Sequence, residues 1–165
     1  FKGDLSKKLF DVFKPNNLTL VDPWKAQSDS IYKDSWYAAR DSNSQKIQDK
    51  YFNDLKEFFR EDILNKKVSI FKLTSEDYFK SNKNKFDLIY IDGNHLYEFV
   101  LNDILNSLNS LNENGMIVLD DYKTRGWWKD GVTKAVDYLQ KKGKITIVTK
   151  HNLFNYHNQC IITKK

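Results

Sequence analysis

The most constraining feature of this 165-residue chain is the stretch from Phe86 to Tyr122, FDLIYIDGNHLYEFVLNDILNSLNSLNENGMIVLDDY. Its first six residues are mostly apolar or β-branched and lead into Asp92-Gly93-Asn94, which predicts a buried strand ending in a turn. Apolar residues then recur at spacings of three and four from Tyr97 to Leu111, as on one face of a helix. Asn114-Gly115 predicts the end of that helix, and Met116–Leu119 predicts a second buried strand.

Three aspartates follow these two strands, Asp92 after the first and the pair Asp120-Asp121 after the second. Parallel strands joined by a helix end on the same edge of a sheet, which is where open α/β sheets bind ligands. Three carboxylates in one crevice repel one another unless a cation neutralises them, and oxygen ligands favour Mg²⁺, Ca²⁺ or Mn²⁺. The pattern predicts a metal site of Asp92, Asp120 and Asp121. Alternatively, Asp92 only starts a turn and one of the pair is a solvated loop residue.

His95 lies three residues beyond Asp92, close enough to share the same crevice. A histidine there can act as a general base near neutral pH, because its unperturbed pKa is about 6.5. It could equally stack against an adenine or hydrogen-bond the loop. We predict His95 and Asp120 as the catalytic pair.

The rest of the chain alternates between strands and helices, which predicts a Rossmann-like, doubly wound, mostly parallel sheet. The last two strands have no helix between them and should pair antiparallel across a nine-residue loop. The expected order is a helix at 4–13, a strand at 18–21, a loop at 25–44 with one helical turn, a helix at 47–63, a strand at 68–73, a short helix around 78–79, the central unit at 86–119, a loop at 123–130, a helix at 131–139, and strands at 145–149 and 159–163.

Polar residues also follow the two earlier strands. Asp22 ends the first, where a carboxylate can accept hydrogen bonds from a ribose diol, although an Asp before a proline is also a common turn former. Ser75-Glu76-Asp77 follows the next strand and could meet an adenine amine or simply cap a helix.

Composition narrows the class of protein. The length suits one domain, a single cysteine (Cys160) suits a reducing compartment, and no apolar stretch approaches the roughly 18 residues that span a bilayer. The net charge of +5 comes from 27 basic and 22 acidic residues, and the lysines are scattered, as on a solvated surface. A nucleic-acid footprint would need them clustered on one face. The absence of a GxGxxG motif disfavours an ordinary nicotinamide dehydrogenase.

Three segments together resemble a known family: FDLIYIDGNHLYEFVLNDI, LNENGMIVLDDY and GVTKAVDYL. They are similar to the class I S-adenosylmethionine-dependent methyltransferases, in particular the macrocin-type sugar O-methyltransferases and the cephalosporin-hydroxylase-like (DGxH) group. The resemblance implies a seven-stranded sheet with an antiparallel last strand. It also implies methyl transfer from S-adenosylmethionine to an oxygen of a small molecule or sugar, assisted by a metal such as Mg²⁺. The single cysteine and the lack of a membrane-spanning stretch predict a cytoplasmic protein without a membrane partner.

The resemblance also assigns residues. Asp22 resembles the acidic residue that binds the cofactor ribose, and Trp24, Ser75 and Glu76 are expected near the adenosine. Asp92 and His95 are expected to contact the cofactor as well, and Asp92, Asp120 and Asp121 match the metal-binding aspartates of macrocin-type members. His95 departs from that pattern and agrees better with the DGxH group.

At the front of the chain, Gly3 resembles the final glycine of the family's cofactor-binding turn. The strand and the rest of the turn that should precede it are missing, so we expect residues 1–165 to be a single methyltransferase domain that is N-terminally incomplete.

Two other readings stay open. The missing glycine turn would suit a catalytically inactive or regulatory domain of the same fold. The +5 charge and the aromatic 25–44 segment would suit a methyltransferase acting on RNA or protein, although we expect no nucleic-acid partner. The sequence leaves the acceptor and homo-oligomer formation undecided.

Overall fold

The computed structural model describes residues 2–153 and 157–165, with the side chains of 151–157 outside the description. The chain divides into two compact units, residues 1–78 and 79–165, and each has its own sheet. Within the described part of the chain, no helix has both the length and the apolar character needed to span a membrane.

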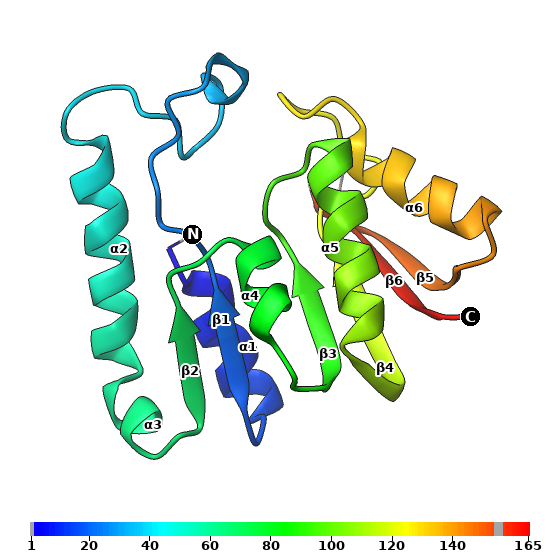
Figure 1. Cartoon of the computed structure of the whole chain (residues 1–165), viewed down its shortest axis with the longest axis horizontal. Helices are drawn as coiled ribbons and strands as arrows, with labels where there is room; N and C mark the ends of the chain where they lie inside the picture. The colour runs from blue at the N-terminus through cyan, green and yellow to red at the C-terminus, as the bar shows by residue number, and fades with distance from the viewer. Residues whose placement is uncertain (1, 154–156) are drawn as a thin grey trace. The chain divides into compact units, whose positions relative to one another are not determined.

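The first unit is built around two parallel strands (Figure 1). Leu18 pairs with Val68 and Val21 with Phe71, so both strands end at the same edge. Its elements are α1 (Asp4–Phe13), β1 (Leu18–Val21), the 3₁₀ turn η1 (Ser30–Tyr32), α2 (Ser44–Phe58), α3 (Arg60–Leu64), β2 (Val68–Phe71) and the start of α4 (Ser75–Ser81).

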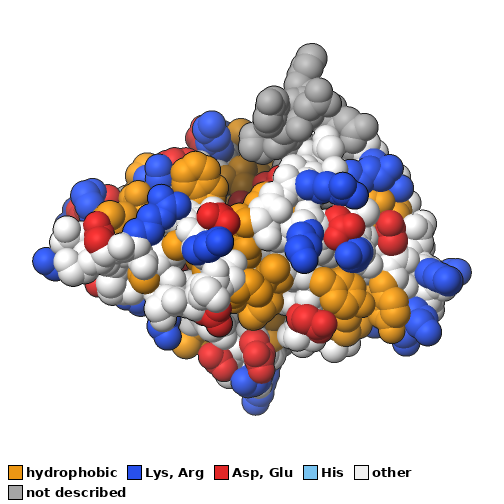
Figure 2. Space-filling model, turned by 90° about the horizontal axis from the view of Figure 1, so that it is seen from above, with side chains coloured by type: hydrophobic (Ala, Val, Ile, Leu, Met, Phe, Trp, Pro, Cys, Tyr) orange, Lys and Arg blue, Asp and Glu red, His pale blue; other side chains and the backbone are white. Residues whose placement is uncertain are grey.

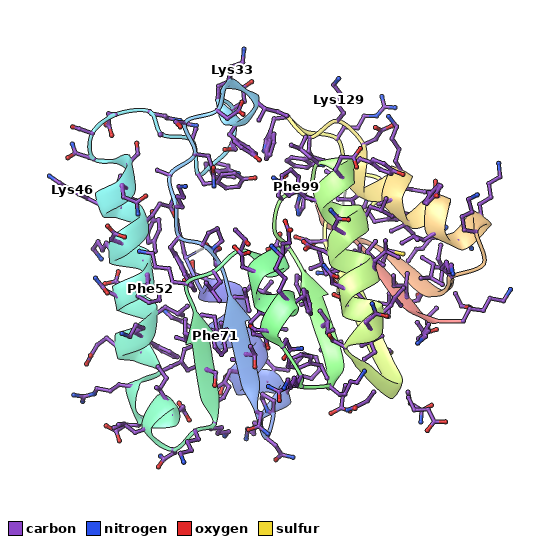
Figure 3. All side chains as sticks on the ribbon, viewed as in Figure 1. Lys33, Lys46, Phe52, Phe71, Phe99 and Lys129 are labelled. Carbon is purple, nitrogen blue, oxygen red and sulfur yellow. The ribbon has the colours of Figure 1, made fainter. Side chains whose placement is uncertain are left out.

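The core of this unit consists of Trp24, Leu55, Phe59 and Val68, each at most 2% exposed. Phe52 projects from α2 toward this cluster, with its ring centroid 5.0 Å from that of Trp24 (Figure 3). The predicted helix at 47–63 is interrupted at Phe59, where the backbone leaves the helical region. The Phe59 side chain is fully buried and its ring meets that of Phe10 edge-on, so packing accompanies the break.

The second unit contains a four-stranded sheet in the order β3-β4-β6-β5 (Figure 1). β3 and β4 are parallel, whereas β6 is antiparallel to both its neighbours. This confirms the α/β class and the antiparallel end of the sheet. The elements are β3 (Phe86–Ile91), α5 (Tyr97–Asn109), β4 (Leu111–Leu119), α6 (Gly131–Lys141), β5 (Ile145–Leu153) and β6 (His157–Lys164).

One prediction in this unit is wrong: Asn114-Gly115 does not end the helix. α5 already ends at Asn109, and both residues lie within β4, which carries extra residues opposite the start of β3. Leu111 is buried in the core and pairs with Phe86, which fixes the early start of the strand. A Cβ on Gly115 would lie 2.9 Å from the Phe86 carbonyl oxygen, so the glycine permits a close backbone approach.

The C-terminal hairpin is longer than predicted. β5 extends to Leu153 and β6 starts at His157, so most of the expected nine-residue loop is strand. The remaining residues 154–156 lie outside the described part of the chain.

Candidate functional site

The carboxyl ends of β3 and β4 bring together the side chains that the sequence singled out. The backbone N–H of Asp120 donates to the Ile91 carbonyl at 3.1 Å, so the two strand ends are still paired where the acidic residues begin. Asp121 has a φ of +56°, in the left-handed region that non-glycine residues seldom adopt. The predicted convergence of these strand ends is therefore present within the second unit.

His95 lies between two of the aspartates. Its Nδ1 is 3.2 Å from Asp121 Oδ2, and its Nε2 is 3.5 Å from Asp92 Oδ1. The histidine is only 8% exposed, and Nε2 makes no well-aligned hydrogen bond within the described residues. Burial disfavours the charged ring, but hydrogen bonding and attraction from the two carboxylates outweigh it and raise the pKa of His95 to about 9. The ring is therefore an imidazolium at neutral pH.

A loop that follows β4 fixes this ring from other sides. The Trp128 indole meets the imidazole edge-on, with ring centroids 5.0 Å apart. At the start of α6, a Cβ on Gly131 would lie 2.3 Å from the His95 carbonyl oxygen and 2.6 Å from the Tyr97 nitrogen. Only glycine allows α6 to begin so close to the His95 loop. The contact between Trp128 and His95 could not be predicted from sequence, because Trp128 lies in a polar loop without periodicity.

Asp120 has different surroundings. Burial, together with repulsion from Asp92 and Asp121, raises the pKa of its carboxyl group. Its Oδ1 is buried and has no hydrogen-bond partner among the residues that the structure describes. Nearby, the Gln159 amide donates to the Tyr90 hydroxyl at 2.6 Å, and both residues interact with Asp120. Tyr90 and Gln159 were missed because they lie inside strands, where a polar residue gives no pattern.

These residues do not fit the predicted metal site of Asp92, Asp120 and Asp121. Mg²⁺ needs oxygen ligands at about 2.0–2.1 Å in near-octahedral geometry. Here an imidazole contacts Asp92 with one nitrogen and Asp121 with the other, so the ring separates the two carboxylates. Among the side chains of residues 2–150 and 158–165, no three His, Cys, Asp or Glu groups are placed so that they could hold a metal ion.

In the first unit, Asp22 stands at the carboxyl end of β1. Its backbone N–H donates to the Phe71 carbonyl at 3.2 Å, and its Oδ1 accepts from the Trp24 backbone N–H at 2.6 Å. This is the turn-forming arrangement considered as the alternative for Asp22. Trp24 has a φ of +40° and is 2% exposed, so its ring supports the turn from within the core. The cofactor roles of Asp22 and Trp24 stay predictions.

The start of α4 lies after β2, at the same end of this parallel pair. Thr74 is the capping residue: its Oγ1 accepts from the Asp77 backbone N–H at 3.1 Å and donates to the Asp77 carboxylate at 2.9 Å. The side-chain cap considered for Ser75, Glu76 and Asp77 is thus supplied by the residue before them. The predicted adenosine contacts of Ser75 and Glu76 remain predictions.

Gly3 adopts a φ of +85° at the N-terminus of α1. A Cβ there would lie 2.4 Å from Leu55 Cδ1, so packing within the first unit already requires a glycine at this position. Its role in cofactor binding is untested by this geometry.

Basic side chains do not gather into one patch on the face drawn in Figure 2, where lysines and arginines are interspersed with acidic residues. Several of them are paired locally, as in Lys72 with Asp49 at 2.7 Å and Lys134 with Asp130 at 3.0 Å. On this face the net charge of +5 does not form a continuous nucleic-acid footprint.

Comparison with known proteins decides the family. Residues 4–122 match a family model described as a methyltransferase domain. The chain belongs to this methyltransferase family. Together with the fold, this makes it an S-adenosylmethionine-dependent methyltransferase of class I, as the sequence predicted. A sequence comparison with curated proteins gave no match.

Solved structures similar to this methyltransferase share its fold at low sequence identity. The methyltransferase PaMTH1 of Podospora anserina, bound to SAH, has a TM-score of 0.63 and 16% identity over 99% of this chain and 78% of that one. The O-methyltransferase TomG of Streptomyces achromogenes, bound to SAM and involved in tomaymycin synthesis, has a TM-score of 0.60 and 10% identity. The match covers 99% of this chain and 79% of TomG. A ribosomal protein L11 methylase of Lactobacillus delbrueckii has a TM-score of 0.51 and 18% identity, over 98% of this chain and 77% of that one. The fold is therefore shared by enzymes with different acceptors.

Proposed function

We propose that this methyltransferase transfers the methyl group of S-adenosylmethionine to a hydroxyl oxygen of a small-molecule acceptor. The observation that carries the proposal is the juxtaposition of the His95 imidazolium with Asp120, whose buried Oδ1 has no partner among the described residues. An O-methyltransferase needs both a group that polarises a hydroxyl and a group that takes its proton. TomG and PaMTH1 show that this fold suits enzymes that bind SAM or SAH.

Asp120 is the proposed general base. Its raised pKa makes the carboxylate a better proton acceptor than an ordinary surface aspartate. When bound, S-adenosylmethionine supplies an electrophilic methyl sulfonium. Asp120 would take the hydroxyl proton while the oxygen–methyl bond forms and the methyl–sulfur bond breaks, with neutral S-adenosylhomocysteine as the leaving group. The Tyr90 and Gln159 side chains hold the carboxylate from the sheet side.

His95 takes a different role from the general base expected of it. A ring that is already protonated at neutral pH cannot accept the acceptor proton. It can stabilise the negative charge that develops on the acceptor oxygen as the proton leaves. The imidazolium is already held in place by Asp92, Asp121 and Trp128, so little reorganisation is needed during the reaction.

In the first unit, we propose that Asp22, Ser75 and Glu76 recognise the adenosine part of the cofactor. Support comes from their place at the carboxyl ends of two adjacent parallel strands, where open α/β sheets bind nucleotides. A carboxylate at the end of β1 has the chemistry needed to accept hydrogen bonds from a ribose diol. A cytoplasmic location belongs to the same proposal.

Two measurements test the proposal in sequence. Calorimetry with S-adenosylhomocysteine should show saturable binding, and no binding at millimolar ligand would overturn the cofactor assignment. Transfer of labelled methyl groups should then be assayed on phenols, catechols and sugars, with Asp120→Asn as the inactive comparison and Asp87→Asn, on the same unit, as the control. Activity on RNA or protein that falls steeply with added salt would favour a macromolecular acceptor instead.

A further inference from the structure

The side chain of His95 stands in the place where the acidic residues of this site would otherwise meet. Asp92 and Asp121 come from the ends of different strands, and each contacts a different nitrogen of the same ring, at 3.5 and 3.2 Å. The side chains of His95 and Asp121 are only 10% and 15% exposed, so water screens this contact poorly. Three neighbouring carboxylates need a positive partner, and the ring is the group that reaches two of them.

The ring is also fixed in that place. The Trp128 indole packs against it edge-on at 5.0 Å. Gly131 approaches the His95 carbonyl so closely that a Cβ would lie 2.3 Å from it. The start of α6 therefore holds the backbone that carries the ring, and the Trp128 indole packs against the ring itself.

We propose that the His95 side chain takes the structural place of a divalent cation, so that this methyltransferase works without a metal ion. The ring joins Asp92 to Asp121 through its two nitrogens, and the buried Nε2 makes no well-aligned hydrogen bond among the described residues. A divalent cation would bring carboxylate oxygens to about 2 Å from one centre, an arrangement that the interposed ring prevents. The catalytic part of this inference rests on the proposed function, whereas the part about metal binding does not.

Binding of Mn²⁺ to the wild-type protein tests the metal part directly and needs no acceptor. Electron paramagnetic resonance should show no saturable Mn²⁺ binding in the millimolar range, and EDTA should leave methyl transfer unchanged. Saturable binding that is lost in Asp92→Asn and Asp121→Asn, but kept in Asp87→Asn, would overturn the proposal. Asp87 is the control because its carboxylate accepts a hydrogen bond from the Asn112 amide and does not contact His95.

Removing the His95 ring should allow the three aspartates to bind a divalent cation. In His95→Ala the three aspartates lose their positive partner, so the variant should gain Mn²⁺ binding, and Asp121→Asn added to it should abolish that binding again. Methyl transfer should fall by roughly 10²-fold or more and recover in part with free imidazole or Mn²⁺. A folded His95→Ala that keeps SAH affinity but responds to neither additive would overturn the proposal.

Failure of the proposed methyl transfer and failure of the inference about the metal ion give different experimental results. If no acceptor is ever methylated, the proposed function fails, but the Mn²⁺ measurements on the wild type and on His95→Ala still decide the metal part. If His95→Ala does not fold, the wild-type binding and the EDTA experiment decide it alone.

Discussion

The two parallel strand pairs of this chain end in polar residues of the same kinds but in different physical states. At the end of β1, the Asp22 carboxylate accepts a hydrogen bond from the backbone two residues on, and Thr74 caps α4 after β2. At the ends of β3 and β4, side chains from separate strands contact one another: His95 with Asp92 and Asp121. The first region is stabilised locally, whereas the second depends on long-range contacts.

The pKa values of both predicted catalytic residues are raised at the ends of β3 and β4. Burial lowers the pKa of His95 but its two carboxylate neighbours raise it more, and burial together with neighbouring carboxylates raises the pKa of Asp120. Shifted titratable groups gather where burial and fixed charges act together, which is typical of reaction sites. The raised pKa values support the proposal that proton transfer takes place at the ends of β3 and β4.

The largest expected effect is on turnover. Replacing Asp120 by Asn keeps the shape of the side chain but removes the proton acceptor, so kcat should fall by about 10²–10⁴-fold. The SAH dissociation constant should stay within a few-fold of the wild type. Rapid-quench or steady-state assays with labelled S-adenosylmethionine measure the first quantity, and calorimetry the second. Equal losses in both would mean that Asp120 serves the cofactor and not the proton.

The second effect concerns pH. The pKa of His95 in the folded protein, about 9, lies above its usual value of 6.5. Its contribution to stability is therefore complete below pH 6.5 and is lost as the pH rises through 9, by an amount on the order of a few kcal/mol. Denaturant unfolding measured from about pH 6 to about pH 10 should show this loss in the wild type but not in His95→Gln.

If the free energy of unfolding falls equally with pH in the wild type and in His95→Gln, another group is responsible for the loss. The carboxyl groups of Asp92, Asp120 and Asp121 face the ring, and burial together with the neighbouring carboxylates raises the pKa of Asp120. The ordinary pKa of an aspartate, about 3.9, lies far below this window. The experiment should be run with EDTA present, so that added metal cannot replace the ring.

The third effect is on packing. Gly131→Ala places a methyl group 2.3 Å from the His95 carbonyl oxygen and 2.6 Å from the Tyr97 nitrogen, both backbone atoms. We expect the free energy of unfolding to fall by about 1–3 kcal/mol. Gly93→Ala is the matched control, because its Cβ would meet only Asp103 Oδ2 at an ordinary 3.9 Å. Similar losses in the two variants would show that the contact between α6 and the His95 loop is unimportant.

The parts of the fold that depend on local sequence patterns could be predicted from the sequence. Phe86–Ile91 and Leu18–Val21 are strands with the predicted bounds, because apolar runs bounded by turn residues are local signals. The convergence of Asp92 with Asp121 followed from the rule that parallel strands end on one edge. The end of α5 was missed, because the pairing of Leu111 with Phe86 is a tertiary contact that overrides Asn114-Gly115.

Less of the candidate site than of the fold could be predicted from the sequence. The sequence placed His95 near the aspartates, but not between them, because that depends on the left-handed backbone at Asp121 and on Trp128. Tyr90 and Gln159 could not be found either. Tyr90 comes near Asp120 through the parallel pairing of β3 with β4, and Gln159 through the antiparallel pairing of β6 with β4. Side-chain contacts across strands leave no periodic signal in one sequence.

The fourth effect sharpens the role of the first strand pair. Asp22→Asn keeps an oxygen that can accept from the Trp24 backbone N–H, so the free energy of unfolding should change by less than about 1 kcal/mol. It removes the charge proposed to hold the ribose, so SAH affinity should fall roughly 10-fold. Calorimetry and denaturant unfolding on the same preparation separate the two. Unchanged affinity would restrict Asp22 to its turn.

The smallest effect separates helix capping from cofactor binding at α4. Thr74→Ala removes the acceptor for the Asp77 backbone N–H and should cost about 1 kcal/mol of stability with little change in SAH affinity. Ser75→Ala should do the opposite, because the cap is supplied by Thr74 while Ser75 is proposed to meet the adenosine. If Ser75→Ala instead lowers stability and leaves affinity intact, Ser75 belongs to the helix start. The first strand pair would then contribute to cofactor recognition through Asp22 and Glu76 alone.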